Sequence, residues 1–414
     1  MSFISFIREN LRWLGGGFLL TFFASFGQTF YISLSAGEIR AEYGLSHGEW
    51  GGIYMLATLA SALTLPWLGQ LVDRMPVSRI AAGVMMMLAS ACALMAVSHH
   101  LATLVVAIYC LRLFGQGMMT HIALTAMGKW YSASRGRAVS LASIGANAGE
   151  AVYPLVFVLV AAAVGWRNAW FACAVVLLLV ALPSITALMA VERTPRNTDP
   201  VSRRSAVRDW TRGEVLRDPL FWIMLAGVLA PPFIGTTIFF HQVHLVEIRG
   251  WSQAAFASSF SLMSVMVISC ALVAGYLVDR FTALRILPVY LVPLAAACFT
   301  LGSFSGQWAA FAFMGLLGVS YGFSTILFGA LWPEVYGTAH LGAIRATIIA
   351  VMVFATAIGP GVTGWLIDQG IWYPHQILAM GGYCIAAAFV MFLASRAVIA
   401  RLQADPLPAV PNLP

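Results

Sequence analysis

One six-residue stretch occurs twice in this sequence, and its spacing constrains the fold more than any other feature. Gly-Gln-Leu-Val-Asp-Arg covers 69–74 and Gly-Tyr-Leu-Val-Asp-Arg covers 275–280, an offset of 206 residues in a chain of 414. Each copy lies where a long apolar segment ends in an Asp-Arg pair. A single copy would only indicate a charged helix end, but two copies half a chain apart indicate a duplicated membrane unit.

The composition is typical of a chain that crosses a membrane many times. Hydrophobic residues make up 60% of the sequence and charged residues only 9%, with a mean hydropathy of +0.86, whereas soluble proteins carry roughly 25% charged residues. The net charge of +7 comes mainly from arginines in loops, so we expect lipid around the chain and no nucleic-acid partner. The six cysteines lie inside apolar segments without disulfide or metal-ligand spacing, and we expect no metal and no cofactor.

Twelve apolar segments approach or exceed the length that crosses a bilayer, about 20 residues. Six precede and six follow an arginine-rich polar segment at 192–218. The predicted fold is an all-α polytopic membrane protein, with twelve transmembrane helices in two pseudo-symmetric six-helix bundles. We predict an N-terminal bundle at 1–191, a cytoplasmic linker at 192–218, a C-terminal bundle at 219–403 and a tail at 404–414. The twelve segments cover residues 13–36, 50–71, 80–98, 101–127, 138–163, 168–190, 219–245, 253–277, 284–303, 307–331, 344–367 and 375–396.

The basic residues predict the orientation of the chain. Of the 23 lysines and arginines, all except Arg40, Arg112, Arg167 and Arg249 fall in segments that lie inside when the N-terminus is inside. Cytoplasmic loops carry such an excess of basic residues. We therefore expect a multi-pass protein of the plasma membrane, the inner membrane in a bacterium, with both termini cytoplasmic. We expect no cleavable signal peptide, because no Ala-x-Ala-like site follows the first segment.

An arginine lies near the middle of the fourth apolar segment. Arg112 is costly at that depth unless it faces a cavity or a partner, and Gln116, four residues on, shares its helical face. Gly115 and Gly117 permit close approach of a neighbouring helix. Arg112 and Gln116 are therefore candidate substrate-binding residues. The alternative is an arginine that carbonyls and a carboxylate fix in place to hold helices together.

The only acidic residue near the middle of a segment is Glu150, in the fifth. Asn147 precedes it by three residues and lies on the same helical face. Asn147 and Glu150 are candidate substrate-binding residues, and Glu150 is also the candidate proton carrier. A permanent ion pair between Glu150 and Arg112 is the alternative, and the sequence favours neither reading.

Polar residues in three further segments complete the candidate set. The first segment carries a polar stripe at helical spacing, with Gln28 at mid-depth and Tyr31 beside it, which is typical of a water-filled path or of a helix–helix contact. The seventh is broken by two adjacent prolines, which frees carbonyl groups. His241 lies beyond that break near the outer mouth, where simple solvation of the imidazole is the alternative. Tyr321 lies among glycines in the tenth segment.

No catalytic motif is present. The sequence contains no His-Glu-x-x-His, no P-loop, no Gly-x-Ser-x-Gly and no pair of carboxylates near a reacting volume. We therefore expect a protein that is not an enzyme.

The sequence resembles those of the major facilitator superfamily of secondary transporters, and the resemblance extends over nearly the whole chain. The stretch at 69–74 with Arg79 resembles the superfamily's loop signature between its second and third helices, although the basic part is thinner here. Arg112 with Gln116 and Gly117 resembles its fourth-helix motif, with the glutamine one position later than in the commonest form.

A second set of residues is similar to one branch, that of the monocarboxylate porters and oxalate–formate exchangers. The set comprises Trp130-Tyr131-x-x-x-Arg135-Gly136-x-Ala138, Gly145-x-x-x-Gly149, Gly359-Pro360-Gly361 and Trp365-Leu366-Ile367-Asp368. Relatives in that branch place a lysine in the first helix, or an acid or arginine in the eighth, and neither helix is charged here. Arg112 would then be the cationic anchor, or the substrate need not be an anion.

The resemblance implies alternating access, in which two bundles rock about a central site. It also implies a conformational gate in which each Asp-Arg pair contacts the opposite bundle on the cytoplasmic side. The implied gate residues are Asp73, Arg74, Arg135, Asp279, Arg280 and Arg345.

Three functions remain open. The first is a monomeric secondary transporter for a small, monocarboxylate-like organic anion, coupled to protons by symport or antiport. The second keeps the fold but exports an amphipathic cation or a neutral solute. The third is a non-transporting membrane receptor or scaffold, which should lack a continuous polar lining.

Overall fold

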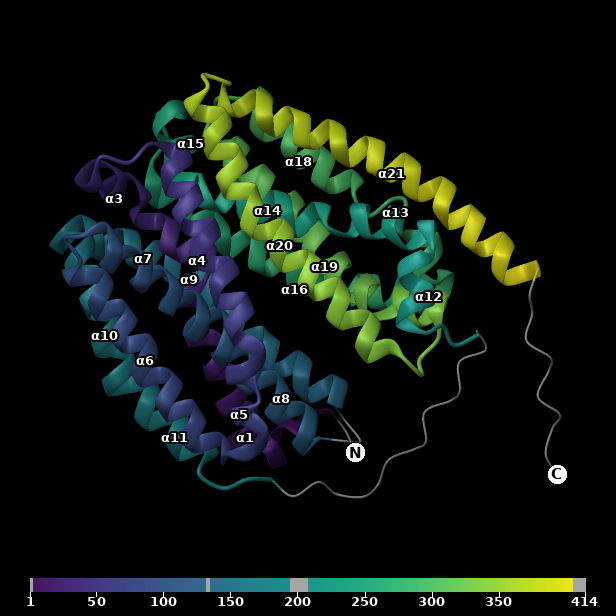
Figure 1. The fold of residues 1–414 in the computed structure, drawn as a ribbon, viewed down its shortest axis with the longest axis horizontal. Coiled ribbons are helices and arrows are strands. Elements are labelled where there is room, and N and C mark those ends of the chain that lie inside the picture. The colour runs from purple at the N-terminus through teal and green to yellow at the C-terminus, as the bar shows by residue number, and fades with distance from the viewer. Residues whose placement is uncertain (1–2, 132–134, 194–207, 405–414) are drawn as a thin grey trace. The chain divides into compact units, whose positions relative to one another are not determined.

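The computed structural model describes residues 3–131, 135–193 and 208–404, and within these ranges it contains helices and no strands (Figure 1). Two compact units can be distinguished. Unit 1 comprises Met1–Pro200, Thr236–Ser264 and Ala357–Ile371, and unit 2 comprises Val201–Gly235, Val265–Thr356 and Trp372–Pro414.

The helices of unit 1 are α1 (Phe3–Phe23), η1 (Ala24–Gly27), α2 (Thr29–Ile32), η2 (Ser33–Ser35), α3 (Ala36–Tyr43), α4 (His47–Gly69), α5 (Leu71–Arg74), α6 (Val77–Val97), α7 (Leu101–Cys110), η3 (Leu111–Met119), α8 (Thr120–Trp130), α9 (Arg135–Val164), α10 (Trp166–Val176), η4 (Leu177–Ala181), α11 (Leu182–Met189) and α15 (Gln242–Arg249). Those of unit 2 are α12 (Arg212–Arg217), α13 (Pro219–Val228), α17 (Ala283–Ile286), α18 (Val292–Ser303), α19 (Trp308–Tyr336) and α21 (Tyr373–Ala404). Three helices have residues in both units: α14 (Ala230–Phe240), α16 (Gln253–Phe281) and α20 (Leu341–Asp368).

Each of the twelve predicted apolar segments consists mainly of helix, although the first is interrupted at Gln28 and the ninth at 287–291. In the described part of the chain, ten helices are long and apolar enough to cross a membrane, and the bent pair Ser5–Gly27 and Thr29–Tyr43 would make an eleventh. The ninth segment, 284–303, contains the shorter helices α17 and α18. The prediction of an all-α, multi-pass membrane protein is confirmed. The boundaries of the bundles, linker and tail stay a prediction, and residues 194–207 and 405–414 lie outside the described residues.

The duplication in the sequence has a structural counterpart at the same offset. Val77 and Ala283 are 206 residues apart, and each is the first residue of the helix that follows an Asp-Arg pair. The backbone N–H of Val77 donates to Glu192 Oε1 at 3.0 Å, and that of Ala283 donates to Glu334 Oε2 at 2.8 Å. These N–H groups have no acceptor within their own helices. Each half of the chain therefore supplies a glutamate to the same position.

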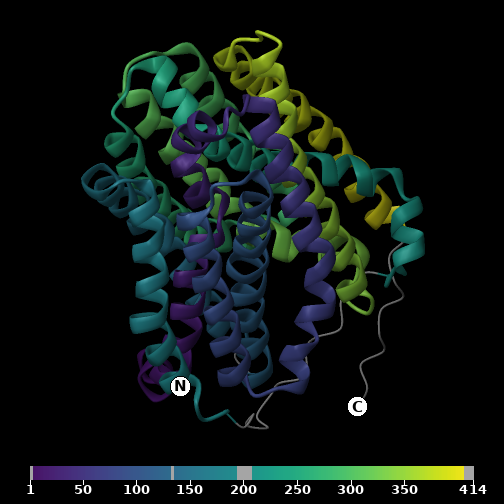
Figure 2. The same ribbon diagram turned by 60° about the vertical axis from the view of Figure 1, so that its left-hand side comes forward.

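Within unit 1, α1 packs along α9, and α6 lies against α10 and α11 (Figures 1 and 2). Gly145 of α9 makes the first contact close, since a Cβ there would overlap the carbonyl oxygen of Phe18. The Thr21 hydroxyl, part of the predicted polar stripe, donates to the carbonyl oxygen of Ala142 at 2.5 Å. At Thr21 the stripe therefore serves a helix–helix contact.

Within unit 2, α18 packs against α19 and α21, and α13 packs against α21. The buried carboxylate of Asp218 joins three elements. It accepts from the Leu220 N–H at 3.1 Å, from the Tyr336 hydroxyl at 3.0 Å and from Arg401 Nη1 at 2.7 Å. Its charge is thus compensated, as a buried carboxylate requires.

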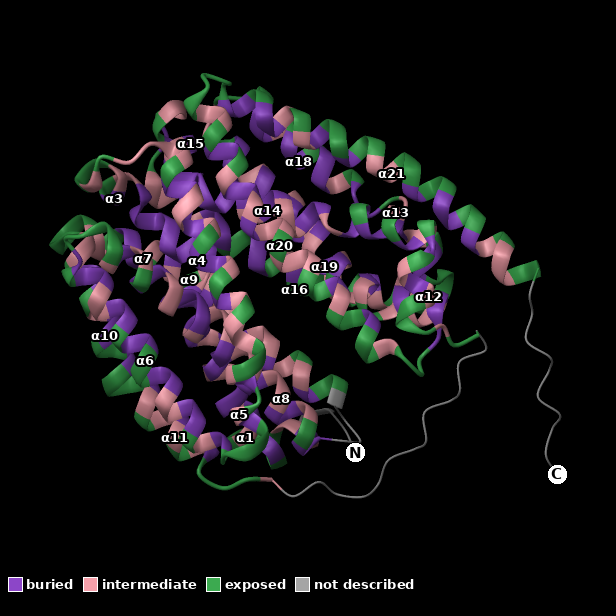
Figure 3. Cartoon of the chain, viewed as in Figure 1, coloured by how far each residue is buried: buried purple, intermediate pink, exposed green. Residues whose placement is uncertain are grey.

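Large apolar side chains remain exposed along α10 and η4 of unit 1, and Figure 3 colours the exposed residues of these helices. Phe171 is 54% exposed and Leu179 is 71% exposed. Exposed apolar side chains of this size are unfavourable in water but suit contact with lipid chains. This exposure agrees with a membrane-spanning bundle.

Candidate functional site

The first apolar segment is not one continuous helix, and its break shapes the candidate site. Gln28 is extended (φ −80°, ψ 153°) between η1, which ends at Gly27, and α2, which begins at Thr29. The helices on either side differ in direction by 44°. A Cβ added at Gly27 would lie 2.7 Å from the Cα of Gly115, so the break is pressed against the backbone of η3.

Arg112 binds the carbonyl group at this break. Its Nη1 donates to the carbonyl oxygen of Gly27 at 3.2 Å and to Thr29 Oγ1 at 3.4 Å. The guanidinium carbon lies 5.3 Å from the ring centroid of Tyr54, whose hydroxyl oxygen is 2.5 Å from Thr29 Oγ1. Arg112 is 6% exposed, and among the described residues its Nε has no hydrogen-bond acceptor. A buried guanidinium with a free N–H suits an anionic ligand.

Arg112 and Gln116 lie in η3, a π-type helical segment whose turns are wider than those of an α-helix. Such segments occur frequently at functional sites. Within the described chain, the buried Gln116 Oε1 has no hydrogen-bond donor. Two unsatisfied polar atoms therefore lie on one short segment. The sequence indicated the polar residues and the flanking glycines Gly115 and Gly117, but not the π-type turns of this segment.

Glu150 and Asn147 lie on α9 with partly exposed side chains. Within the described residues neither side chain forms a hydrogen bond, and Glu150 forms no ion pair with Arg112 or any other residue. The next residue, Ala151, accepts a hydrogen bond from the Ser261 hydroxyl of α16 at 2.7 Å. The structure thus brings a second-half helix beside this part of α9.

Tyr31 lies in a packed aromatic cluster. It is 2% exposed, and its hydroxyl oxygen is 2.9 Å from Cys173 Sγ. Its ring centroid lies 5.1 Å from that of Phe26, 5.0 Å from that of Phe157 and 6.2 Å from that of Tyr153. Tyr153 is three residues after the candidate proton carrier on α9. The aromatic cluster therefore includes a residue one helical turn from Glu150.

His241 lines a small pocket at the start of α4. Its Nε2 is 3.0 Å from the carbonyl oxygen of Pro360 and so donates a hydrogen bond to it. The His47 ring lies 6.2 Å from that of His241 and 4.1 Å from that of His244. Arg40 also lines the pocket, and its buried Nε has no acceptor in the described part of the chain. Sequence reasoning selected His241 but missed Arg40 and His47, which only tertiary contacts bring to it.

Tyr321 belongs to unit 2. Its hydroxyl donates to the carbonyl oxygen of Pro231 at 3.4 Å. The seventh segment is interrupted only at Leu229, between α13, which ends at Val228, and α14, which begins at Ala230. The two prolines themselves lie in the first turn of α14, and 219–240 is long and apolar enough to form one span. Nowhere in the described ranges do three or more His, Cys, Asp or Glu side chains group as metal ligands would.

The sequence profile of the Major Facilitator Superfamily matches residues 17–348, which is most of the chain. The chain belongs to the Major Facilitator Superfamily. It is thus a transporter rather than an enzyme, embedded in a membrane and acting on a small-molecule substrate. No curated protein sequence matches it.

Two solved structures share the superfamily fold with this chain. The first is a bacterial homologue of the human lysosomal transporter Spinster in an inward-facing, unoccupied conformation, with a TM-score of 0.68, 17% identity, and 96% of this chain and 98% of that chain covered. The second is described as such a homologue in an inward-facing, occupied conformation, with a TM-score of 0.62, 17% identity, and 98% and 96% covered. At this identity the likeness concerns the fold.

The first copy of the superfamily's loop signature is joined to α8. Asp73 forms an ion pair with Lys129, whose Nζ also donates to the carbonyl oxygen of Val72 at 3.3 Å. Arg74 is exposed. The side chain of Arg135 lies outside the described residues. Sequence reasoning selected Asp73 but did not select Lys129.

The second copy has fewer partners. Asp279 is exposed and has no hydrogen bond or ion pair from its side chain within the described ranges. Arg280 Nη1 donates to the Tyr276 hydroxyl at 3.2 Å, and Arg345 Nη2 donates to the carbonyl oxygen of Gly329 at 2.8 Å. The role of these residues as a gate stays a prediction.

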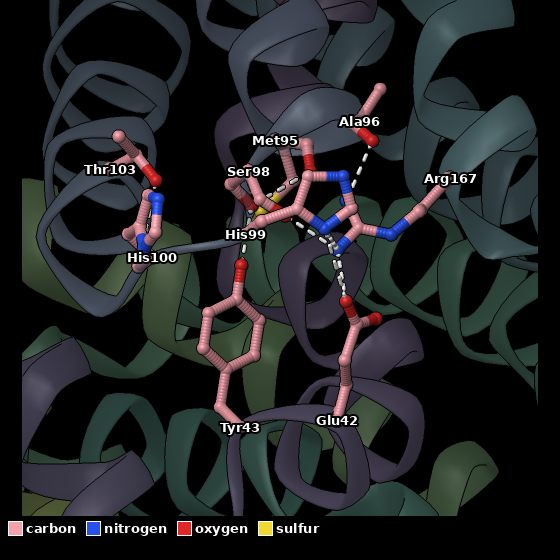
Figure 4. Close-up of polar contacts among 9 residues, drawn as sticks. All are labelled: Glu42, Tyr43, Met95, Ala96, Ser98, His99, His100, Thr103 and Arg167. Atoms are coloured by element: carbon pink, nitrogen blue, oxygen red, sulfur yellow. Dashed lines mark hydrogen bonds and ion pairs between the residues drawn. The ribbon is translucent and has the colours of Figure 1, made fainter.

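Arg167, one of the four basic residues predicted to lie off the cytoplasmic side, has a structural role (Figure 4). Its guanidinium donates to the carbonyl oxygens of Ala96 at 2.7 Å and Ser98 at 2.5 Å, and forms an ion pair with Glu42. The Glu42 carboxylate lies 3.6 Å from His99 Nδ1. Because those carbonyl groups belong to the last turn of α6 and to its C-cap residue, Arg167 caps that helix and ties it to α3.

Proposed function

We propose that this chain is a secondary active transporter that moves a small, monocarboxylate-like organic anion by alternating access, coupled to protons. In this proposal Arg112 binds the anion, with Gln28, Gln116 and Asn147 around it. Glu150 carries the proton. Tyr31, His241 and Tyr321 complete the predicted substrate-binding set.

The observation that carries the proposal is the environment of Arg112. Its guanidinium is buried against a carbonyl oxygen, a hydroxyl group and the face of Tyr54, all of them uncharged groups. A buried charge needs a counter-charge to offset the loss of its hydration. Since no carboxylate in the described chain lies within ion-pair distance of Arg112, a substrate carboxylate can supply it, through the free Nε as well.

The proton-carrying role rests on the isolation of Glu150. Within the described chain its carboxyl group has no ion pair and no hydrogen bond. A lone carboxyl group at membrane depth is typical of the proton relays of pumps and transporters. Such a group exchanges protons with water only in a conformation in which water reaches the carboxyl group. This requirement links proton movement to alternating access.

Alternating access is supported by the similar solved structures, which are described as inward-facing, one unoccupied and one occupied. In this chain the gate would use Asp73, Arg74 and Arg345 at one contact and Asp279, Arg280 and Arg135 at the other. We place both termini in the cytoplasm and the protein, as a monomer, in the plasma membrane of its cell, which is the inner membrane in a bacterium.

One observation favours a second candidate, an exporter of an amphipathic cation or a neutral solute. The aromatic rings of Phe22, Phe26 and Tyr153 lie together, with Tyr153 4.7 Å from Phe22 and 4.6 Å from Phe26 between centroids, and Tyr153 is three residues after the isolated Glu150 on α9. An acidic group next to aromatic faces suits a lipophilic cation. In that case Glu150 would hold the ligand.

Uptake into proteoliposomes separates the two. Wild-type protein should accumulate labelled lactate when the outside is acidic, and Arg112→Gln should abolish this uptake. The matched control is Arg396→Gln, because Arg396 is exposed and its loss should leave uptake unchanged. Normal lactate uptake by Arg112→Gln would reject the anion proposal. Uptake of tetraphenylphosphonium that depends on Glu150 but not on Arg112 would favour the second candidate.

A further inference from the structure

The small pocket at the start of α4, which we call the Arg40 pocket, lies among several helices of unit 1. Its free volume is about 10 Å³, which is enough for one group of the size of a water molecule. A ligand in it would contact α3, α4 and α15 at once. The lining consists of Ala36, Gly37 and Arg40 from α3, His47 and Trp50 from α4, and Phe240, His241, Val243 and His244 from the junction of α14 and α15.

Two residues of the Arg40 pocket have buried N–H groups without an acceptor. Within the described residues, neither Nε of Arg40 nor Nε1 of Trp50 has a hydrogen-bond partner, and Trp50 is only 1% exposed. Both groups can donate a hydrogen bond but cannot accept one. Leaving a buried donor without an acceptor is costly. We therefore expect the occupant of the pocket to be an acceptor.

The lining itself offers more donors than acceptors. It contains no aspartate or glutamate in the part of the chain that the structure describes. His241 Nε2 is a donor, since it lies 3.0 Å from the carbonyl oxygen of Pro360. The rings of His47 and His244, 4.1 Å apart between centroids, each add one N–H donor when neutral and two when protonated. This chemistry matches an anion.

Two carboxylates near the pocket balance part of its positive charge. Glu247 and Asp368 attract Arg40 electrostatically, but over the described ranges neither forms a hydrogen bond or an ion pair with it. Asp368 instead accepts from the Ser46 hydroxyl at 2.7 Å and from the His47 backbone N–H at 3.0 Å. Because these negative charges weaken the binding of an anion, we expect a Kd on the order of 10 mM.

The Arg40 pocket is separate from the candidate site at Arg112. Trp50 stacks on Phe240 with ring centroids 5.6 Å apart, and Phe240 packs on Tyr54 at 4.7 Å. The Tyr54 ring in turn faces Arg112. These three aromatic residues are each at most 1% exposed. A row of packed rings therefore runs from the pocket to Arg112, which is not part of the pocket lining.

We propose that the Arg40 pocket binds one halide ion between Arg40 and Trp50, and that the bound ion holds α3 and α15 against α4. Arg40 is one of the four basic residues predicted to lie off the cytoplasmic side, and it is partly exposed, so the ion enters from water on the outer side. The halide is a bound structural ion rather than a substrate, and the inference does not depend on the proposed function.

Thermal unfolding in detergent tests this inference without a transport assay. The melting temperature of the wild-type protein is measured in about 100 mM sodium bromide, roughly ten times the expected Kd, and in sodium gluconate of the same concentration. The gluconate anion is too large for the pocket. Because a ligand that binds only the folded state stabilises it, bromide should raise the melting temperature by about 2 °C relative to gluconate.

Two variants should remove this difference between the salts. Trp50→Phe keeps the ring that packs on Phe240 and deletes the N–H, and Arg40→Met keeps a long side chain without the guanidinium. Trp308→Phe and Arg396→Met are the matched controls, since both residues are exposed and lie in unit 2, and they should retain the full difference. Each variant is compared with itself in the two salts, so a lower basal melting temperature does not hide the result.

Anomalous scattering from bromide in crystals of the wild-type protein is a second measurement that needs no variant. We expect a bromide peak within hydrogen-bond distance of Arg40 Nε and Trp50 Nε1. Equal melting temperatures in the two salts, together with no bromide peak in the pocket, would overturn the inference and leave water as the acceptor. A wild-type difference that persists in both pocket variants would overturn it as well.

Arg112→Gln separates the pocket from the candidate site. This variant should keep the bromide effect, because Arg112 does not line the pocket. Loss of the effect in Arg112→Gln but not in Arg40→Met would place the bromide at Arg112 and reject the pocket. None of these measurements uses lactate uptake. Failure of the pocket would therefore leave the substrate proposal standing, and failure of lactate uptake would leave the pocket standing.

Discussion

The Ser33 hydroxyl donates a hydrogen bond to the carbonyl oxygen of Phe239, 2.6 Å away and 206 residues further along the chain. The same offset separates Asp73 from Asp279 and Gly44 from Gly250, and both of these glycines end a helix in the left-handed conformation. The hydrogen bond therefore joins two positions that the repeat offset makes equivalent.

Ser33→Ala should lower the melting temperature, because the substitution removes the three hydrogen bonds of the Ser33 hydroxyl, with Phe30, Phe239 and Gln242. Ser33 is fully buried, and it also accepts from Gln242 Nε2 at 2.8 Å. Leaving buried partners unsatisfied costs about 1–3 kcal/mol per group. Thermal unfolding followed by intrinsic fluorescence measures the effect. Ser143→Ala is the control, since that hydroxyl bonds only within its own helix, to Val139, and an equal shift in both would contradict the expectation.

Tyr54→Leu should weaken substrate binding more than Tyr54→Phe. The ring of Tyr54 faces the guanidinium of Arg112, and a cation–π contact contributes about 0.5–2 kcal/mol. Phenylalanine keeps the ring and loses only the hydrogen bond to Thr29. We expect KM for lactate to rise roughly 2- to 30-fold in Tyr54→Leu and less in Tyr54→Phe. Equal effects would assign the role to the hydroxyl group instead.

Glu150→Gln should abolish accumulation driven by a pH gradient and retain exchange of labelled for unlabelled lactate. The amide keeps the shape of the side chain but carries no titratable proton, so only the coupled step is lost. Net uptake and counterflow in the same proteoliposome preparation measure the two steps. If both fell together, the carboxyl group would have a structural or substrate-binding role.

Gly145→Ala should destabilise the first half of the chain. A methyl group at this position overlaps the Phe18 carbonyl oxygen, which is backbone and cannot rotate away. Overpacking of this kind typically costs about 1–3 kcal/mol. Gly83→Ala is the matched control, because a Cβ there would meet nothing within 4 Å. Size-exclusion profiles and melting temperatures compare the two, and similar values would mean that α1 moves away from α9 at little cost.

The apolar segments could be predicted from sequence because each is long and continuous, and every one of them consists mainly of helix. Pro231 and Pro232, which cannot donate backbone hydrogen bonds, predicted a break in the seventh segment, and the structure has a one-residue interruption just before them, at Leu229. The break at Gln28 had no such signal. It follows from the close approach of Gly27 to Gly115, a tertiary contact that no local pattern records.

The charged residues of the candidate site were predicted from the sequence, but the groups that they contact were not. The depth of Arg112 followed from its position in the fourth segment. Its main acceptor is the Gly27 carbonyl oxygen, and every residue has a carbonyl group, so the sequence could not select this one. Tyr31 was expected beside a polar path, but the bend after Gly27 places it in the aromatic cluster with Phe26 and Phe157.

Because a main-chain oxygen holds Arg112, the orientation of its guanidinium is protected from most mutations. No replacement of the side chain at position 27 removes that oxygen, and most replacements are blocked by the backbone of η3. Natural or laboratory evolution of a new substrate preference is therefore expected to keep Gly27 and Arg112 constant. Substitutions should concentrate at Thr29, Tyr54 and Gln116, because changes in these side chains leave the Gly27 carbonyl oxygen in place to orient the Arg112 guanidinium.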